Sequence, residues 1–472
     1  MITPRPRQAQ AIADLRKAYR FGYKAPILIA PTGFGKSATA ICMIQSALDK
    51  GKRVWFIAHL KEILNDTSGR LTDAGIPHGW IASGRDGNRR LPVQVAMVQT
   101  LVRRLDQHQP PDLIIVDEAH LAVANTYQQI FEWAGAGPKF KRPGGAHLLH
   151  LTATPCRLDG RGMGEVADIL VPTCSTQDLI DEGLLAAIRY YAPSEPDLSG
   201  VHTVAGDFNQ GELAAAMDKP VITGSAVAHY RKLAHNRPAV AFCVTVEHAT
   251  NVAEQFRQAG YRAVAISGES DTVERDAALQ GLRDGSLDVV CNCALWVAGV
   301  DAPTIGCIIL LTPTQSVVKY LQSVGRGLRT HPGKTDCIIL DHAGNVKRHG
   351  LPTDLREWTL AAVEKKKNAK KSEVPVKTCP VCFATVPSVV TDCQCGHHFE
   401  PVGREINEVE GELQEITAAA KAQAVQDRKR EQGRSQTEAD LIRIGRARGM
   451  KRPELWARHV LRARAAKEAQ KR

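Results

Sequence analysis

Short apolar runs alternate with stretches of helical spacing along the first 350 residues. The apolar runs are Pro26 to Ile29, Leu113 to Val116, Ala239 to Val244 and Asp288 to Cys293, and helical spacing follows at Ala38 to Leu48 and His248 to Phe256. Strands that alternate with helices form parallel sheets covered by helices. The pattern therefore predicts an α/β protein with two similar halves, residues 1–157 and 218–350, joined by the turn-rich segment 158–217.

The segment Ala30-Pro-Thr-Gly-Phe-Gly-Lys-Ser37 lies between the first predicted strand and the first of these helices. Backbone N–H groups of such a loop form an anion site at a helix N-terminus. A lysine there reaches the β and γ phosphates, and a serine hydroxyl ligates Mg²⁺. The alternative is an ordinary glycine-rich turn. We expect a nucleotide site formed by Thr32, Gly33, Gly35, Lys36 and Ser37.

The run Leu113 to Val116 ends in Asp117-Glu118-Ala-His120. An aspartate at the end of a parallel strand next to the phosphate-loop strand can hold Mg²⁺, and an adjacent glutamate can polarise the attacking water. We therefore expect Asp117 to bind the metal together with Ser37, and Glu118 to be the general base. A solvated turn is the alternative.

Together these segments resemble the superfamily two DEAD/DEAH-box helicases and translocases, over about residues 1–350. The resemblance implies two tandem RecA-like lobes that bind ATP between them. Arg5 and Gln8 are similar to the adenine-reading segment of that family, and Gly299 and Asp301 to its Gly-x-Asp segment. Relatives commonly carry Glu where Ala298 stands.

The segment Tyr320 to Arg329 resembles the QxxGRxxR motif of the family. Helical spacing would put Gln322, Arg326 and Arg329 on one side of a helix. A guanidinium supplied from the opposite lobe neutralises charge on the transferring phosphoryl group. We expect Arg329 to be this finger and Arg326 to contact the γ phosphate, whereas a solvated basic helix is the alternative.

The resemblance also implies residues that contact nucleic acid or couple it to hydrolysis. These lie in Ile57 to Glu62, Val95 to Leu101, the DEAH segment and Leu151 to Pro155: His59, Gln99, Thr100, His120, Thr152 and Thr154.

Charge is unevenly distributed over the 472 residues, whose formal net charge is +11. Residues 421–472 hold 16 Lys and Arg against 6 Asp and Glu, a net of +10, so residues 1–420 sum to about +1. A basic stretch of this kind gives sequence-independent affinity for a phosphate backbone. The region 401–472 is therefore expected to be a basic helical tail, either nucleic-acid binding or merely solvated. No segment is apolar enough to cross a membrane, which favours the cytoplasm.

Four of the twelve cysteines fall in two close pairs between the lobes and the tail. Cys379 and Cys382 have C-x-x-C spacing, and Cys393 and Cys395 are separated by one residue. Such pairs present thiolates to Zn²⁺. We expect a structural zinc knuckle over residues 376–400, preceded by a basic linker at 351–375. His397 or His398 could replace Cys395 as the fourth ligand, and free cysteines are the alternative.

These expectations combine into an ATP-dependent helicase with ATP, Mg²⁺ and Zn²⁺ as cofactors, acting on nucleic acid and more on DNA than on RNA. Overall it resembles bacterial and phage helicases related to restriction-enzyme motor subunits. Alternative functions are a duplex translocase without strand separation, an RNA helicase, and a nucleic-acid-binding module with a dead motor.

Overall fold

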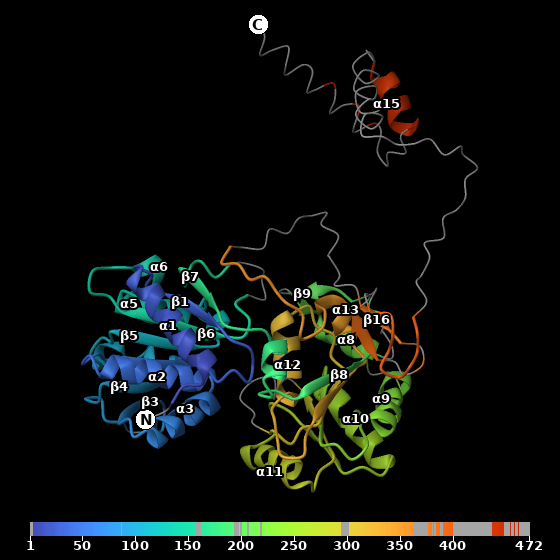
Figure 1. Ribbon diagram of the computed structural model, residues 1–472, viewed down its shortest axis with the longest axis horizontal. Coiled ribbons are helices and arrows are strands. Elements are labelled where there is room, and N and C mark those ends of the chain that lie inside the picture. The colour runs from blue at the N-terminus through green and yellow to red at the C-terminus, as the bar shows by residue number, and fades with distance from the viewer. Residues whose placement is uncertain are drawn as a thin grey trace. The chain divides into compact units, whose positions relative to one another are not determined.

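The computed structural model describes residues 3–85, 87–156, 162–192, 198, 201–204, 207–217, 220–293, 302–361, 376–379, 381, 384–387, 390–399, 437–447, 454, 457 and 461. Residues 1–400 form one compact unit and residues 401–472 another. Two parallel sheets make up most of the first unit, and each is covered by helices (Figure 1).

The first sheet has seven parallel strands in the order β3-β4-β2-β5-β6-β1-β7. Its strands are β1 (Pro26–Ile29), β2 (Val54–Ala58), β3 (His78–Ile81), β4 (Val93–Met97), β5 (Leu113–Asp117), β6 (His147–Thr152) and β7 (Ile169–Pro172). Its helices are α1 (Pro6–Arg20), α2 (Lys36–Leu48), α3 (Lys61–Asp73), α4 (Val98–Leu101), α5 (Asn125–Ala134) and α6 (Gly137–Phe140), with short 3₁₀ turns at Leu105–Gln107 and Ala119–Leu121.

The second sheet has six parallel strands in the order β12-β13-β11-β14-β15-β8. These strands are β8 (Ala187–Tyr191), β11 (Ala239–Cys243), β12 (Ala263–Ile266), β13 (Val289–Cys293), β14 (Cys307–Leu310) and β15 (Asp336–Asp341). The helices around them are α7 (Thr176–Asp181), α8 (Gln210–Met217), α9 (Pro220–Leu233), α10 (Val246–Gln258), α11 (Thr272–Asp284), α12 (Val317–Gly327) and α13 (Asn345–His349), and β9 (Thr203–Val204) pairs with β10 (Asp207–Phe208).

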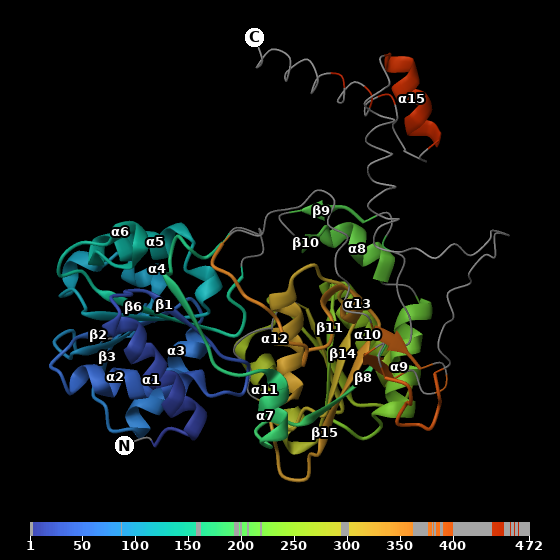
Figure 2. The same ribbon diagram turned by 45° about the horizontal axis from the view of Figure 1, so that its top comes forward.

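Alternate residues of each strand enter cores on opposite faces of the sheet, as the period of two in a strand requires. Leu28 packs with α1 and α2 on one face of the first sheet, whereas Ile27 packs with α5 on the other. Figure 2 shows α1, α2 and α3 on one side of this sheet and α4, α5 and α6 on the other. The buried α/β arrangement predicted from the strand runs is therefore confirmed.

From the sequence we expected the strand that ends in Asp117 to lie next to the phosphate-loop strand, but it does not. β6 lies between β5 and β1, with Leu151 opposite Asp117 and Thr152 opposite Ile29. Because parallel strands can be joined in many orders, the apolar runs alone do not determine which strands are neighbours.

The segments expected to be connections contribute to both sheets. β7 extends the first sheet beyond residue 157, and β8 joins the second sheet before residue 218. Within the expected linker 351–375, Trp358 and Leu360 pack against the first lobe's core, and Leu360 O accepts a hydrogen bond from Gly164 N at 3.2 Å. The described residues 351–361 therefore pack against the first lobe, whereas the basic run Lys365 to Lys371, which led to the expectation of a linker, lies outside the described residues.

A short hairpin follows, formed by β16 (Val376–Thr378) and β17 (Thr385–Pro387). Ala384 pairs with Tyr191 at the end of edge strand β8. In the second unit, α15 (Glu438–Ala447) begins after Thr437, whose Oγ1 accepts a hydrogen bond from Asp440 N at 3.2 Å. In the described residues no helix is both long and apolar enough to span a bilayer.

Candidate nucleotide and nucleic-acid site

The phosphate loop connects β1 to α2 with a backbone that only glycine adopts easily. Gly33 and Gly35 have φ of +89° and +92°, in the left-handed region that disfavours other residues. α2 begins at Lys36, so the unpaired N–H groups of its first turn face the loop. Lys36 Nζ lies 3.4 Å from Ala30 O. This is the anion-binding geometry expected from the sequence, with Ser37 next to Lys36.

Gln8 of α1 lies behind this loop and is only 4% exposed. Its Nε2 donates to Phe34 O at 2.9 Å, and its Oε1 accepts from Arg5 N at 2.9 Å. A Cβ on Gly35 would collide with the same Nε2. The amide therefore ties α1 to the phosphate loop, and it keeps one N–H and one lone pair for a further partner.

Asp117 and Glu118 lie where β5 ends. Burial and the neighbouring Glu118 raise the pKa of Asp117 to about 6, although Lys36 acts to lower this pKa. Glu118 has φ of +54°, a left-handed conformation that costs a non-glycine residue free energy. Both successive carboxylates line the same cavity. Asp117 Oδ1 accepts a hydrogen bond from Glu118 N at 3.0 Å.

Helix α12 of the second sheet reaches this site. Gln322 Nε2 donates to Glu118 Oε2 at 3.2 Å. A Cβ on Gly325 would lie 2.9 Å from Thr32 Oγ1, so only glycine allows this approach to the phosphate loop. We expected Arg329 to lie on the same side of this helix as Gln322 and Arg326. The helix ends at Gly327, however, so Arg329 lies beyond it. Arg329 instead pairs with Leu185 in an isolated β-bridge.

One cavity of about 450 Å³ collects these groups. It is lined by eleven of the residues expected at the nucleotide site: Arg5, Thr32, Gly33, Gly35, Lys36, Ser37, Asp117, Glu118, Gln322, Arg326 and Arg329. Gln8 does not line it, and Gly299 and Asp301 lie outside the described residues.

The residues expected to contact nucleic acid are spread over different environments. Gln99 is exposed at the start of α4, and Thr100 follows it. Thr152 and Thr154 are fully buried, and Thr152 Oγ1 accepts a hydrogen bond from Thr154 N at 3.0 Å. These two threonines stiffen the turn after β6, between the strands that carry the phosphate loop and Asp117.

Two of the expected nucleic-acid residues are histidines: His120 lies beside Glu118, and His59 lies near His120. Burial lowers the pKa of His120 to about 4, and His120 Nδ1 lies 3.4 Å from Glu118 Oε2. Burial and, next, the nearby His120 lower the pKa of His59. Both imidazoles are therefore neutral at pH 7.

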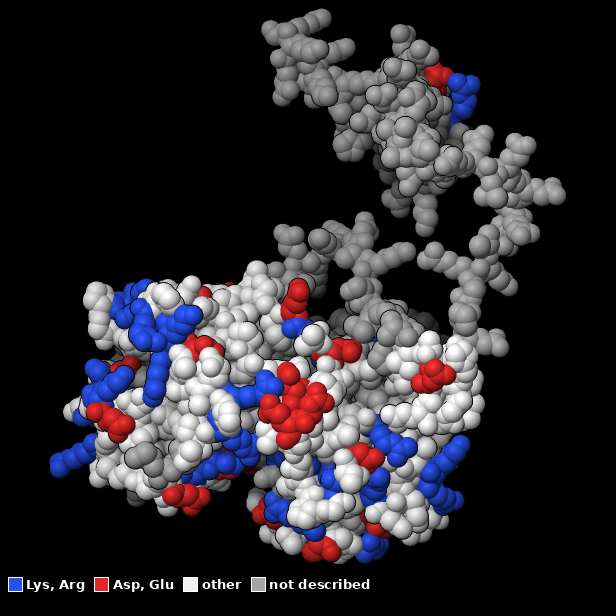
Figure 3. All heavy atoms as spheres, in the orientation of Figure 1, with Lys and Arg blue, Asp and Glu red and all other residues white. Residues whose placement is uncertain are grey.

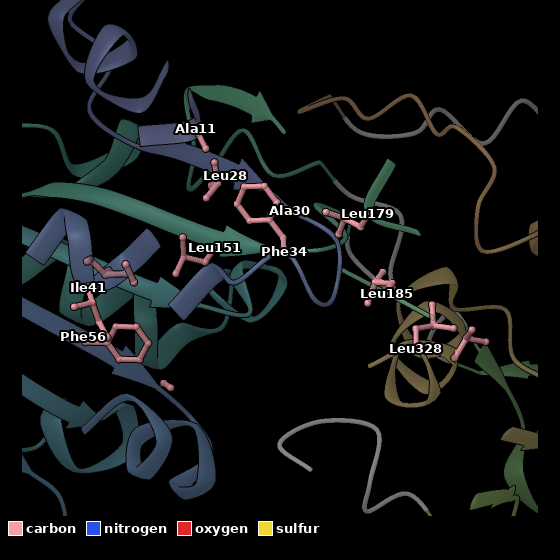
Figure 4. Close-up of a cluster of buried hydrophobic side chains, with 14 of the residues drawn as sticks. Ala11, Leu28, Ala30, Phe34, Ile41, Phe56, Leu151, Leu179, Leu185 and Leu328 are labelled. Carbon is pink, nitrogen blue, oxygen red and sulfur yellow. The ribbon is translucent and has the colours of Figure 1, made fainter. Parts of the chain in front are cut away.

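The sequence did not indicate Leu184 and Leu185, which line the same cavity. Leu185 is 3% exposed, and a Cβ on Gly33 would collide with its side chain. Figure 4 shows Leu185 and Leu179 beside the loop that carries Phe34, with Leu328 on the far side of Leu185. In the sequence, the only indication that these leucines are buried was the short apolar stretch Leu184 to Ala186, just before β8.

A second group of candidate ligands lies beside the β16–β17 hairpin. The sulfur atoms of Cys379, Cys393 and Cys395 lie within 4.8 Å of one another, and Cys379 Sγ is 3.6 Å from Cys395 Sγ. His398 Nδ1 lies 2.7 Å from Asp392 Oδ1, and the His397 ring packs edge-on against Phe399. Cys382 lies outside the described residues.

Comparisons with known proteins agree with this geometry. Residues 1–157 match the family model described as type III restriction enzyme, res subunit, and residues 225–331 match the helicase conserved C-terminal domain. A Lactococcus phage protein described as a 51.5 kDa protein is 32% identical over 372 residues, which cover 78% of this chain and 77% of the phage protein.

Two further relatives cover the chain in part. A candidate ATP-dependent helicase of Saccharomyces cerevisiae, IRC3, is 32% identical over 259 residues, 53% of this chain but only 37% of the yeast protein. A solved fragment assigned as the HsdR subunit of a type I restriction enzyme from Vibrio vulnificus has the same fold. It superposes with a TM-score of 0.58 at 23% identity and covers 74% of this chain and 66% of the fragment.

Proposed function

Because the chain belongs to the superfamily two helicases related to restriction-enzyme motor subunits, we propose that it uses ATP hydrolysis to move along and unwind DNA. A single observation carries this proposal. One cavity holds the phosphate loop and strand-end carboxylates of the first lobe together with the glutamine and arginines of the second. A site divided in this way makes hydrolysis depend on how the two lobes approach each other.

In this proposal the phosphate loop binds ATP. Lys36 neutralises the β and γ phosphates, and the N–H groups of Thr32 to Ser37 bind their oxygens. Ser37 and Asp117 would hold Mg²⁺, since a hydroxyl and a carboxylate suit this ion and both line the cavity. When bound, Mg²⁺ stabilises negative charge on the phosphate oxygens. Arg5, together with the N–H and the lone pair that Gln8 keeps for a further partner, would bind the adenine. Gly299 and Asp301 would contact the nucleotide from the second lobe.

Hydrolysis requires a water oxygen to attack the γ phosphorus while the bond to the β-phosphate oxygen breaks. We assign Glu118 as the base that accepts the water proton, and Gln322 as the group that orients Glu118 through their hydrogen bond. Arg326 and Arg329 would stabilise the charge that develops on the transferring phosphoryl group. Such arginines contribute a factor on the order of 10³ to 10⁵ in rate.

Nucleic acid would bind at the carboxyl ends of the strands, where Gln99 is exposed. We assign Thr100 to the same surface. We assign His59, His120, Thr152 and Thr154 to coupling nucleic-acid movement to hydrolysis. They lie at or just after the ends of β2, β5 and β6 and are buried or half-buried. DNA is favoured over RNA because the QxxGRxxR segment, together with DEAH, differs from the HRxGRxxR ending of DEAD-box RNA helicases.

The three-sulfur cluster supports a structural zinc site. A tetrahedral ion needs a fourth ligand, and the C-x-x-C spacing supplies Cys382. The basic residues of 401–472 would add sequence-independent affinity for the polymer.

The first experiment measures ATP hydrolysis with single-stranded DNA, duplex DNA, forked DNA and RNA, each beside Lys36→Ala. The proposal expects stimulation by DNA and background turnover for the variant, whose thermal unfolding should be unchanged. Stimulation by RNA alone would point to an RNA helicase. ATP use on duplex DNA without strand displacement would point to a translocase, and no turnover with any polymer would point to a dead motor.

A further inference from the structure

A cleft lined by basic side chains lies at the amino ends of the first sheet's strands. Its volume is about 990 Å³, more than twice that of the nucleotide cavity. Its walls come from the ends of α1 and α2 and from residues at the starts of β5 and β6. The phosphate loop follows the carboxyl end of β1, so the cleft lies at the opposite edge of the sheet from the nucleotide.

Five cations line the cleft, against one carboxylate, that of Asp112. These cations are Arg16, Arg20, Lys24, Lys50 and Lys52. Residues 1–420 together sum to only about +1, so the gathering does not reflect a generally basic surface. Figure 3 shows Lys and Arg side chains clustered on the face of this lobe that carries α1 and α6.

Most of this charge has no internal partner. Asp112 accepts hydrogen bonds from Lys52 Nζ and Arg53 N, both at 2.9 Å. Across the described part of the chain, no ion pair joins Arg20, Lys24 or Lys50 to a carboxylate. Attraction to the negative ends of α1 and α2 accounts for Arg20 in the last turn of α1 and for Lys50 just beyond α2, but not for Lys24.

Two exposed aromatic rings, neither of which lines the cleft, are next in sequence to Arg20 and Lys24. Phe21, directly after α1, is 72% exposed, and Tyr23 is 38% exposed. Lys17 Nζ lies 5.9 Å from the centre of the Phe21 ring. Phosphate-binding cations next to exposed rings are the combination that holds single-stranded or opened nucleic acid, because the rings stack on bases.

We propose that this cleft is a second polynucleotide-binding surface, which holds the phosphate backbone of DNA behind the motor while the carboxyl side of the lobes moves it. The inference rests on the proposed function, because it gives the same polymer a second contact. An acidic protein segment is the rival occupant, but it would make no use of the exposed Phe21 and Tyr23 rings.

Arg20→Glu with Lys50→Glu tests the proposal. The matched control is Arg89→Glu with Arg90→Glu, which reverses the same charge at exposed positions before β4 on the same lobe. Equilibrium binding of the full chain to single-stranded and duplex DNA is measured without nucleotide over a range of salt concentrations. Each lost phosphate contact lowers the slope of log affinity against log salt by about 0.9 on duplex DNA.

We expect the cleft variant to bind DNA more weakly, with the duplex slope reduced by about 2, and the control to match the wild type. In ATP hydrolysis the loss should fall on the KM for DNA rather than on kcat. Thermal unfolding of both variants checks that they fold. Phe21→Ala should weaken binding to single strands more than to duplex.

Equal DNA binding by the two double variants and the wild type would overturn the inference alone and leave the motor assignment intact. Wild-type protein that neither binds nor responds to any polynucleotide would remove the proposed function and the inference with it. Binding of poly-glutamate that the cleft variant loses, with DNA binding unaffected, would assign the cleft to an acidic protein partner and also overturn the inference.

Discussion

Gln322 Nε2 lies 3.2 Å from Glu118 Oε2, which joins the helix of the second lobe to the strand-end carboxylate of the first. Both side chains are shielded, with Gln322 8% exposed and the Glu118 side chain 14% exposed. A hydrogen bond to a charged group in such a site contributes about 1.5–3 kcal/mol. The contact is the direct route by which lobe position can affect the general-base candidate.

Gln322→Ala should therefore lower kcat for ATP hydrolysis by roughly 10- to 100-fold, since each 1.4 kcal/mol is a factor of ten. The KM for ATP should change little, because Gln322 does not contact the phosphate loop's N–H groups. Steady-state kinetics at saturating DNA measures both values. Gln258→Ala, at the end of α10 in the same lobe, is the control, and equal rates for the two variants would contradict the role of Gln322.

Leu185→Ala should destabilise the protein and weaken ATP binding. Removing a buried leucine side chain costs about 2–5 kcal/mol of unfolding free energy, and here the cavity would open against Gly33 of the phosphate loop. Chemical denaturation measures the stability, and titration with a fluorescent ATP analogue measures the affinity. Leu355→Ala provides the control, because Leu355 is 88% exposed and such changes cost at most about 0.5 kcal/mol.

Purified protein should contain about one zinc per chain, because the three clustered thiolates, with Cys382 as the proposed fourth, would bind one tetrahedral ion. Elemental analysis should find the metal absent after Cys379→Ser and retained after Cys42→Ser, a half-buried cysteine of α2. Metal loss should also lower the stability of the second lobe, because Ala384 of the hairpin pairs with Tyr191 of β8. A stable, metal-free wild type would exclude the site.

The same assay can test whether Cys395, rather than His397 or His398, is a zinc ligand. Cys395 Sγ lies 3.6 Å from Cys379 Sγ, whereas His398 faces Asp392. Cys395→Ser should therefore reduce zinc content, and His398→Ala and His397→Ala should not. Loss of metal from either histidine variant with normal content in Cys395→Ser would reverse this assignment.

Deleting residues 421–472 should weaken DNA binding and flatten its salt dependence, because the deletion removes a net charge of +10. Hydrolysis at saturating DNA should survive, since the nucleotide cavity is formed entirely by residues before 331. Filter binding at several salt concentrations measures the slope. An unchanged slope would assign the tail a solvated role only.

The local chemistry of the site could be predicted from the sequence, because it depends on residues a few positions apart. A glycine-rich loop between strand and helix needs positive φ at Gly33 and Gly35, and the carboxylates directly follow a buried strand. The same holds for Gln322 and Arg326, four residues apart on α12. Arg329 was placed less well, because the helix ends before it.

Tertiary structure alone decided which distant segments meet. The strand runs did not determine that β6 separates β5 from β1, because crossover connections allow several strand orders. Neither did they show that Leu185 packs against Gly33, or that cations from α1 and from the connections before β1 and β2 line one cleft. Local patterns specify what each element is, whereas packing in three dimensions determines its neighbours. Packing therefore decided both the contact between the two lobes and the basic cleft at the amino ends of the first sheet.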